Sequence, residues 1–247
     1  MLKRLLALAS TLGMAAHLDF LGVSAIPAVN LEFDTASAPL PGTSKLGGSP
    51  DLPSLDSWPA GGPGPYRFLC QFALDDLPSF DSSPLPKDGL LSFFHVDDPD
   101  GEVEPIEEGY VVALYFPGGV EVQPVEAPPG HSAAPGPFSI GFQLSLDLPQ
   151  DEFQSGGWPF ATEEEAEAYE RELRRSLRSA PDHLLGYPHH STLFYNPSPG
   201  EEWVHLLTLS SVEAVEWCWG DGDQLMIFIE RERLAHGDFS NLRCETG

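Results

Sequence analysis

Most of this chain alternates short apolar runs with segments rich in Pro, Gly, Ser and Asp. Apolar and β-branched runs of this length, bounded by turn residues, predict β-strands. The strands expected on this basis cover residues 26–33, 66–74, 89–96, 110–116, 120–125, 138–146, 203–209 and 225–229. The run at 66–74 is mostly apolar throughout, so it is expected to be a central strand.

Helical patterns occur near the N-terminus and again near residues 162–179. Over residues 1–20 a single apolar stripe predicts an amphipathic helix docked on a core, formed by Leu2, Leu5, Leu6, Ala9, Leu12 and Ala16. In the second pattern, Thr162 and Glu165 predict a capping box, and Pro181 ends the helix. Acids share its surface with the arginines of the later turns, which indicates a solvated face: Arg171, Arg174, Arg175 and Arg178.

The N-terminal stretch has a second interpretation. Its basic start and apolar continuation are also typical of a signal peptide over residues 1–25, with a passable cleavage site after Ala25. The apolar part is too short to span a bilayer. We expect a structural helix and a cytoplasmic protein, with export as the alternative if residues 1–25 act as a signal peptide.

The last third of the chain repeats the order of the earlier segments. "GYP" at 186–188 corresponds to "GSP" at 48–50, "WVHLLTL" to "RFLCQFAL", and "LMIFI" to "LLSFFHV". A fixed offset of about 135 residues predicts an internal duplication. Glycine permits unusual backbone angles and proline blocks helix continuation, so each Gly-X-Pro turn is expected to lead into one half of a sheet.

These patterns together predict an α+β fold, mainly antiparallel sheet built from two degenerate repeats. A single domain is expected over residues 1–247, because two copies packed together would bury both sheet faces in one core. Its expected parts are the N-terminal helix 1–20, a repeat-like half 25–125, linking strands and a helix 126–180, and a repeat-like half 181–247.

The charge of the chain narrows the classes of partner. With 38 acidic and 12 basic residues, the formal net charge is −26. This excess repels the phosphates of nucleic acids and anionic membrane surfaces, so neither is expected as a partner. The same charge is explained by solubility alone or by docking of a basic protein, whose encounter it would accelerate.

Candidate metal and redox sites match their patterns poorly. The cysteines are widely spaced without a CxxC pair, which is typical of a reducing compartment: Cys70, Cys218 and Cys244. His183, His189 and His190 lie close together, but no Cys or Glu stands at a ligand spacing. We therefore expect no cofactor and no catalytic residue, and treat this cluster as a loop with adventitious metal affinity.

The acidic turn at 97–102 partly resembles a calcium-binding loop. Counted from Val96, several positions match: Asp98, Asp100, Gly101, Val103 and Glu107. Val96 replaces the first carboxylate ligand, however, and strands are expected on both sides where helices should flank the loop. An exposed hairpin turn is the preferred interpretation.

Several segments in order resemble the YwqG-like family, a bacterial domain of unknown function. They are "SKLGGSPDLPSLDSWP", "FLCQFALDDL", "LPKDGLLSFF", "HLLGYP", "WGDGDQLMIFIERERL" and "DFSNLRC", from about Ala25 to Cys244. The resemblance implies a cytoplasmic single-domain protein with a leading helix and no established catalytic residues. Thr208 stands where the second copy often has Gln, whereas Gln71 holds that place in the first, so a role for two symmetric glutamines is in doubt.

Five residues form the candidate ligand or partner surface: Lys45, Trp58, Gln71, Trp219 and Asp221. Lys45, in "GTSKLGG", is expected to pair internally, with an anionic ligand as the alternative. Trp219 beside Asp221 would suit a peptide or cationic ligand, or would cover the open end of a barrel or sandwich.

Three functions are compatible with these observations. The preferred one is a non-enzymatic module of regulatory or immunity type that binds a basic protein through its acidic surface. The alternatives are a protein that binds a small ligand in a cleft between the two repeats, and an enzyme with an unrecognised site.

Overall fold

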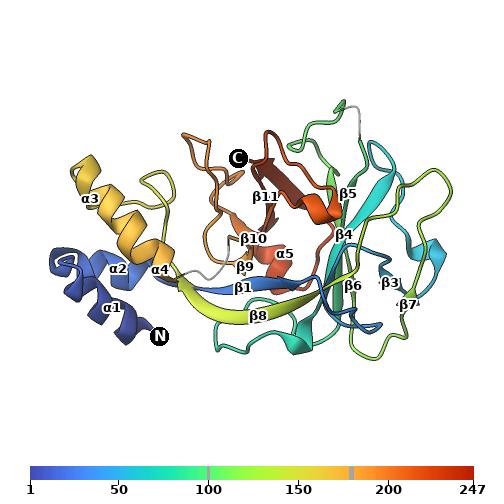
Figure 1. Ribbon diagram of the computed structural model, residues 1–247, viewed down its shortest axis with the longest axis horizontal. Helices are drawn as coiled ribbons and strands as arrows, with labels where there is room; N and C mark the ends of the chain where they lie inside the picture. The colour runs from blue at the N-terminus through green and yellow to red at the C-terminus, as the bar shows by residue number, and fades with distance from the viewer. Residues whose placement is uncertain (99–100, 178–180) are drawn as a thin grey trace.

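The computed structural model describes residues 1–98, 101–177 and 181–247, and it places a group of helices beside a large curved sheet (Figure 1). The helices are α1 (Leu2–Thr11), α2 (Leu18–Ser24), α3 (Glu163–Ala168), α4 (Arg175–Leu177) and α5 (Arg231–Ala235). The strands are β1 (Ile26–Asp34), β2 (Lys45–Leu46), β3 (Asp51–Leu52), β4 (Tyr66–Ala73), β5 (Leu90–Val96), β6 (Val111–Phe116), β7 (Gln123–Pro124), β8 (Phe138–Asp147), β9 (His183–Leu185), β10 (Trp203–Ser210), β11 (Gln224–Glu230) and β12 (Leu242–Thr246).

The sheet has ten antiparallel strands in the order β12-β11-β10-β9-β1-β8-β2-β4-β5-β6. Its two edge strands approach each other and nearly close a barrel: Tyr115 of β6 lies 5.7 Å, ring to ring, from Phe239 next to β12. A salt bridge of 3.3 Å also joins Arg243 of β12 to Glu108, just before β6. The expectation of a mainly antiparallel sheet with a few helices is confirmed.

The strand order is matched on the two sides of the central β1–β8 pair. A short strand (β2 or β9) follows the centre on each side, then a hairpin (β4–β5 or β10–β11), then an edge strand (β6 or β12). The leading strand of each hairpin carries one extra residue, Leu69 in the first and Leu206 in the second. After each short strand the backbone takes positive φ, +71° at Gly48 and +75° at Gly186. Each Gly-X-Pro turn therefore follows a short strand of the same sheet and starts with a glycine of positive φ.

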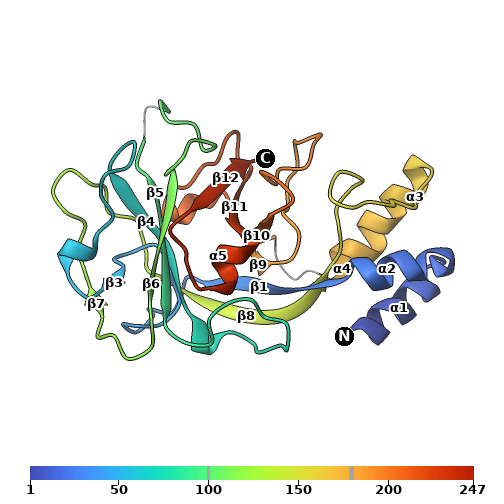
Figure 2. The same cartoon turned by 180° about the vertical axis from the view of Figure 1, so that it is seen from behind.

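One main apolar core lies between the two hairpins, and it unites Leu91, Phe93, Leu207, Ile227 and many other buried residues. All eight residues of β4 are buried, as expected for a central strand. Strands β1 and β8 extend beyond this core towards α1, α2, α3 and α4, which lie together at one end of the molecule in both views, whereas α5 lies against the sheet (Figures 1 and 2).

The helical end has a second, smaller core. Leu5 and Ala9 of α1 and Leu21 of α2 pack with Tyr169 and Leu173. The single helix expected over residues 1–20 is wrong in one respect, because α1 ends in a Schellman motif at Gly13. The amide of Met14 donates to the Ala9 carbonyl (2.9 Å) and Gly13 has φ of +84°, which turns the chain into α2.

The second expected helix is present, with three differences. Thr162 accepts a hydrogen bond from the Glu165 amide at 3.2 Å, but the Glu165 side chain accepts from Ala161 instead of from the cap. Its middle, Tyr169–Arg174, is π-helical. Arg174 is only 2% exposed and donates to the Leu148 carbonyl, so this part of the helix is not the solvated face expected. Arg178 lies outside the described residues.

Short elements were missed by the sequence patterns. β2, β3 and β9 have only two or three residues each, and β12 and α5 have five. The strand expected at 120–125 shrinks to β7, which pairs with β3 in a separate two-stranded sheet. No helix among the described residues is long and apolar enough to cross a membrane.

We predict that Gly186→Ala destabilises the protein by about 2–4 kcal/mol. The new Cβ would lie 2.8 Å from Asp147 Oδ2 and 2.9 Å from the Ala28 Cβ, at a positive φ. Gly157→Ala is the matched control, because it has a similar φ (+78°) with no atom within 4 Å, and should cost only about 1 kcal/mol. Urea unfolding of both variants measures the difference, and equal losses would contradict this packing.

Candidate functional site

A cavity of about 740 Å³ lies beside the second hairpin, β10–β11. Its walls come from the start of β1, the turn after β9, the two strands of the hairpin, α5, and the segments around Ser82, Gln154 and Ser198. Helix α5 follows β11 directly and supplies Arg231, Leu234 and Ala235 to the lining. The cavity thus takes residues from both expected halves of the chain.

Aromatic side chains form much of the lining, together with seven polar or charged residues: Ser82, Gln154, Asn196, Ser198, Glu201, His205 and Arg231. Phe80, Tyr187, Trp203 and Phe228 contribute rings from four separate segments. Glu201 and Arg231 are exposed and supply one charge of each sign. An apolar pocket with a few polar groups is typical of sites that bind small organic molecules.

His205 lies in the lining and is 6% exposed. Its Nδ1 is 3.0 Å from the carbonyl oxygen of Leu185, which can only accept, so Nδ1 carries a proton. In the neutral ring, Nε2 accepts from the Thr208 hydroxyl at 2.7 Å. Both ring nitrogens are therefore used within the fold, which favours a structural role for His205 over proton transfer.

Tyr187 fixes one wall of the cavity to the helical end. Its hydroxyl donates to the Ser24 carbonyl of α2 at 2.8 Å, and its amide donates to Asp147 at 2.8 Å. Burial, together with the Asp147 carboxylate, raises the pKa of Tyr187 to about 12, so the hydroxyl stays protonated at neutral pH.

None of the five candidate surface residues lines this cavity. Lys45 and Gln71 are brought together elsewhere, opposite each other in β2 and β4. Asp221 is exposed in the turn before β11. The cavity was missed because its lining is spread over many short segments, none of which has a motif. The aromatic residues of β10 and β11 were the one available signal.

Lys45 pairs internally, as expected. Its ammonium lies 2.8 Å from Asp51 Oδ2, and both side chains are nearly inaccessible, at 5% and 0%. Gln71 donates to the same carboxylate oxygen at 2.6 Å and accepts from the Asp51 amide at 2.9 Å. Burial lowers the pKa of Lys45, while the hydrogen bond and charge of Asp51 oppose that shift.

Trp58 and Trp219 are both buried. Trp58 lies edge-on to Phe94 at 5.3 Å between ring centroids, and its indole N–H donates to the Tyr66 carbonyl at 3.3 Å. Trp219 is 4% exposed and lies 5.3 Å from the ring of His95. Neither tryptophan presents the exposed platform considered from the sequence.

Several buried polar atoms near Trp219 have no hydrogen-bond partner among the described residues: Arg67 Nε, both ring nitrogens of His95, Trp217 Nε1 and Trp219 Nε1. Burial first, and then the charge of Arg67, lower the pKa of His95 to about 4. The imidazole is therefore neutral at physiological pH, and this end of the main core contains unpaired polar groups.

The histidine cluster is held by protein groups. His183 lies 2.7 Å from the Pro181 carbonyl and 2.8 Å from that of Tyr187. His189 and His190 both contact Gln150. Within the described ranges, no group of three or more His, Cys, Asp or Glu is placed to hold a metal ion. The acidic turn 97–102 lies partly outside those ranges, at 99–100.

We predict that Lys45→Met destabilises the fold by about 3–5 kcal/mol, because it leaves the Asp51 carboxylate buried without its cation. Lys45→Met combined with Asp51→Asn should recover part of this loss, since the amide keeps an acceptor for Gln71 and Gly42. Denaturant unfolding compares the three proteins. If Lys45→Met alone were as stable as the parent protein, the Lys45–Asp51 ion pair would not contribute to stability.

A second prediction concerns how the stability of the fold depends on pH through His95. The unfolded chain protonates His95 near its ordinary pKa of 6.5, whereas the folded chain does so only near 4. Stability should fall as the pH drops between these values, by roughly 3 kcal/mol from this group. In His95→Phe that part of the pH dependence should disappear, while carboxylate titrations remain in both proteins. If His95→Phe does not fold, His95→Gln is used in its place. Parallel stability–pH curves of the parent and the variant would show that His95 does not contribute this pH dependence.

Comparison with known proteins gives the family but no activity. No curated protein matches the chain. The family pattern described as "Domain of unknown function (DUF1963)" matches residues 44–246, a range that begins after β1 and contains most of the cavity lining. The narrower YwqG-like assignment stays a prediction. Since the match covers most of the sequence, the chain belongs to the DUF1963 family of domains of unknown function.

Proposed function

We propose that this protein binds a small organic molecule in the cavity beside β10–β11. The observation that carries the proposal is the cavity itself: about 740 Å³, walled by four aromatic rings. Pockets for ligands of drug or metabolite size fall in this range of volume and have this kind of lining. The exposed Glu201 and Arg231 would interact with polar substituents of the ligand.

The same residues favour binding over catalysis. Among the described lining residues, the ionisable groups are two exposed charges, the satisfied His205 and a tyrosine held by Ser24. An acid–base pair would need ionisable groups that converge on a substrate in a water-poor site. A binding protein is therefore the better supported alternative to an enzyme.

We further infer that the two halves of the sheet arose by duplication. The matched strand order, the extra residue at the same place in both hairpins and the positive φ at Gly48 and Gly186 support this. The cavity takes residues from both halves, but none of the residues expected at a cleft between the repeats lines it. We also propose that the chain belongs to the bacterial YwqG-like family and that residues 1–247 form a single domain.

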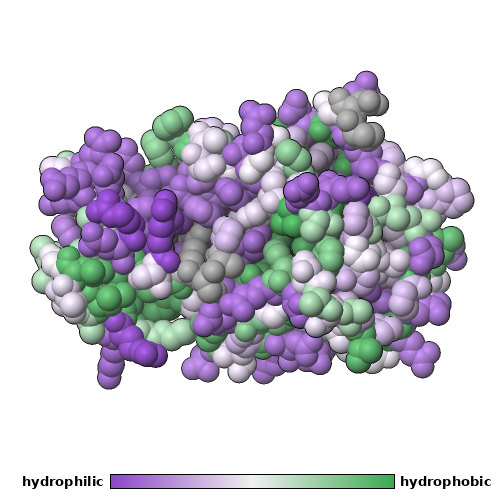
Figure 3. Space-filling model, in the orientation of Figure 1, coloured by the Kyte–Doolittle hydropathy of each residue, from purple (hydrophilic) through white to green (hydrophobic). Residues whose placement is uncertain are grey.

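Docking of a basic protein is the second candidate, and the net charge of −26 favours it. Hydrophilic surface covers α3 in Figure 3, where Glu163, Glu164 and Glu167 are exposed, while hydrophobic surface lies over α1 and α2. Such docking would weaken steeply with salt. A pulldown whose recovered partners are insensitive to salt, or absent, would count against it.

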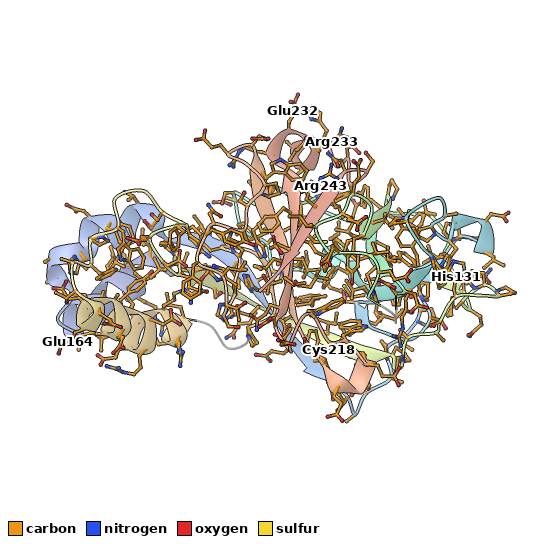
Figure 4. All side chains as sticks on the ribbon, turned by 90° about the horizontal axis from the view of Figure 1, so that it is seen from above. His131, Glu164, Cys218, Glu232, Arg233 and Arg243 are labelled. Carbon is orange, nitrogen blue, oxygen red and sulfur yellow. The ribbon has the colours of Figure 1, made fainter. Side chains whose placement is uncertain are left out.

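The binding proposal is tested by thermal shift with a broad metabolite panel. A ligand at 100 times its Kd stabilises the folded state by about 2.7 kcal/mol, which is a rise of several degrees in Tm. In Ala235→Trp, where a lining residue on α5 is enlarged, the shift should be lost. Glu232→Trp is the control, because Glu232 lies on the same helix outside the lining (Figure 4). No shift across the panel would overturn the proposal.

A further inference from the structure

The two hairpins place a comparable pair of aromatic residues just before the extra residue of their leading strand. In the first hairpin, β4–β5, Phe68 lies opposite Phe94. In the second, β10–β11, His205 lies opposite Phe228. The ring centroids within each pair are similarly spaced, 5.4 Å in the first and 5.9 Å in the second.

What covers the two pairs is different. Over the first pair lies the indole of Trp58, only 8% exposed and at 69° to the ring of Phe94. The second pair lines the cavity instead. The cavity is thus found at the position that an aromatic side chain of the protein fills in the first hairpin.

The hydrogen-bond acceptor of the Trp58 indole also has a counterpart. In the first hairpin the Pro65 carbonyl accepts from the Asp97 amide across the ladder, and the next carbonyl, that of Tyr66, accepts from the indole. Successive carbonyls of a strand point to opposite edges.

In the second hairpin the Glu202 carbonyl accepts from the Arg231 amide. The carbonyl of Trp203 is therefore turned to the opposite edge, as that of Tyr66 is, and Trp203 lines the cavity. The second hairpin thus offers an aromatic pair and a backbone acceptor in the arrangement that binds an indole in the first.

The loop before β10 leaves this place open. Tyr195 stands as many positions before Trp203 as Trp58 does before Tyr66, so it is the positional counterpart of the indole. Tyr195 is nevertheless 50% exposed, and its hydroxyl donates to Glu245 of β12 at 3.2 Å. The contact with Glu245 holds this ring away from the position that Trp58 takes.

We propose that the ligand is a planar aromatic heterocycle with a ring N–H, of indole type, which lies edge-on to Phe228 and donates to the Trp203 carbonyl. This inference rests on the proposed function and names the chemical class of its ligand. Edge-to-face contacts between rings are favourable, and a buried N–H needs an acceptor. Arg231 and Glu201 at the rim would select the charged substituents of the natural compound.

The test is titration calorimetry of the full chain with matched probes: indole, 1-methylindole, benzofuran and the saturated octahydroindole. Indole should bind at least tenfold more tightly than each of the others, because only it combines a planar aromatic ring with an N–H. Equal binding of indole and 1-methylindole, or tighter binding of octahydroindole, would overturn the inference and leave the cavity as a ligand site. No binding by these probes or by any compound of the broad panel would overturn the proposed function as well.

A matched pair of variants ties binding to the cavity. Phe228→Leu and Phe94→Leu remove buried phenylalanines at counterpart positions, 1% and 0% exposed, so their stability losses should be similar. Only Phe228→Leu should weaken indole binding, by about tenfold. Equal effects of the two variants on binding would overturn the inference. If either variant fails to fold, the comparison of indole with 1-methylindole on the parent protein decides alone.

Discussion

The antiparallel pairing of β1 with β8 is the constraint on which the rest of the structure depends. It runs from Ile26 opposite Asp147 to Asp34 opposite Ser139, and it carries β9 on one side and β2 on the other. Side chains alternate between faces along a strand, so a slip of one residue would exchange the faces on which both hairpins pack. The same two strands extend to the helical end, which connects the smaller core to the sheet.

This framework has different loops attached to its two comparable sides. The segment before β4 inserts Trp58 into the core, whereas the segment before β10 keeps Tyr195 at the surface against Glu245. A difference in loops over a similar sheet is how one fold gains a site, because loops tolerate change that the paired strands do not. The cavity and its proposed ligand follow from this difference.

Charge is distributed unevenly between the interior and the surface. Few cations balance the many carboxylates, and one of the three lysines, Lys45, is buried against Asp51. Elsewhere in the core, the ring nitrogens of His95 and the indole nitrogens of Trp217 and Trp219 are buried without hydrogen-bond partners among the described residues. At one end of the second hairpin, Arg233 forms a salt bridge of 2.7 Å with Glu230. Figure 4 shows Arg233 and Arg243 at this end of the hairpin and Cys218 at the opposite end. Most of the negative charge therefore remains on the surface.

The sequence by itself determined the long elements. The apolar runs at 66–74 and 225–229 became strands because their composition and length leave few alternatives, and Thr162 caps a helix through a local hydrogen bond. The internal pair of Lys45 was also predictable, because in a chain with 38 acidic and only 12 basic residues a cation has many carboxylates within reach. These features depend on neighbours in sequence or on bulk composition.

Only the tertiary structure decided the rest. β2 and β9 are too short to show a period, and they exist because β1, β8 and the hairpins supply their partners. The cavity depends on segments that are distant in the sequence. No local pattern distinguishes the buried Trp58 from the exposed Tyr195, since burial is settled by the folded chain around each ring.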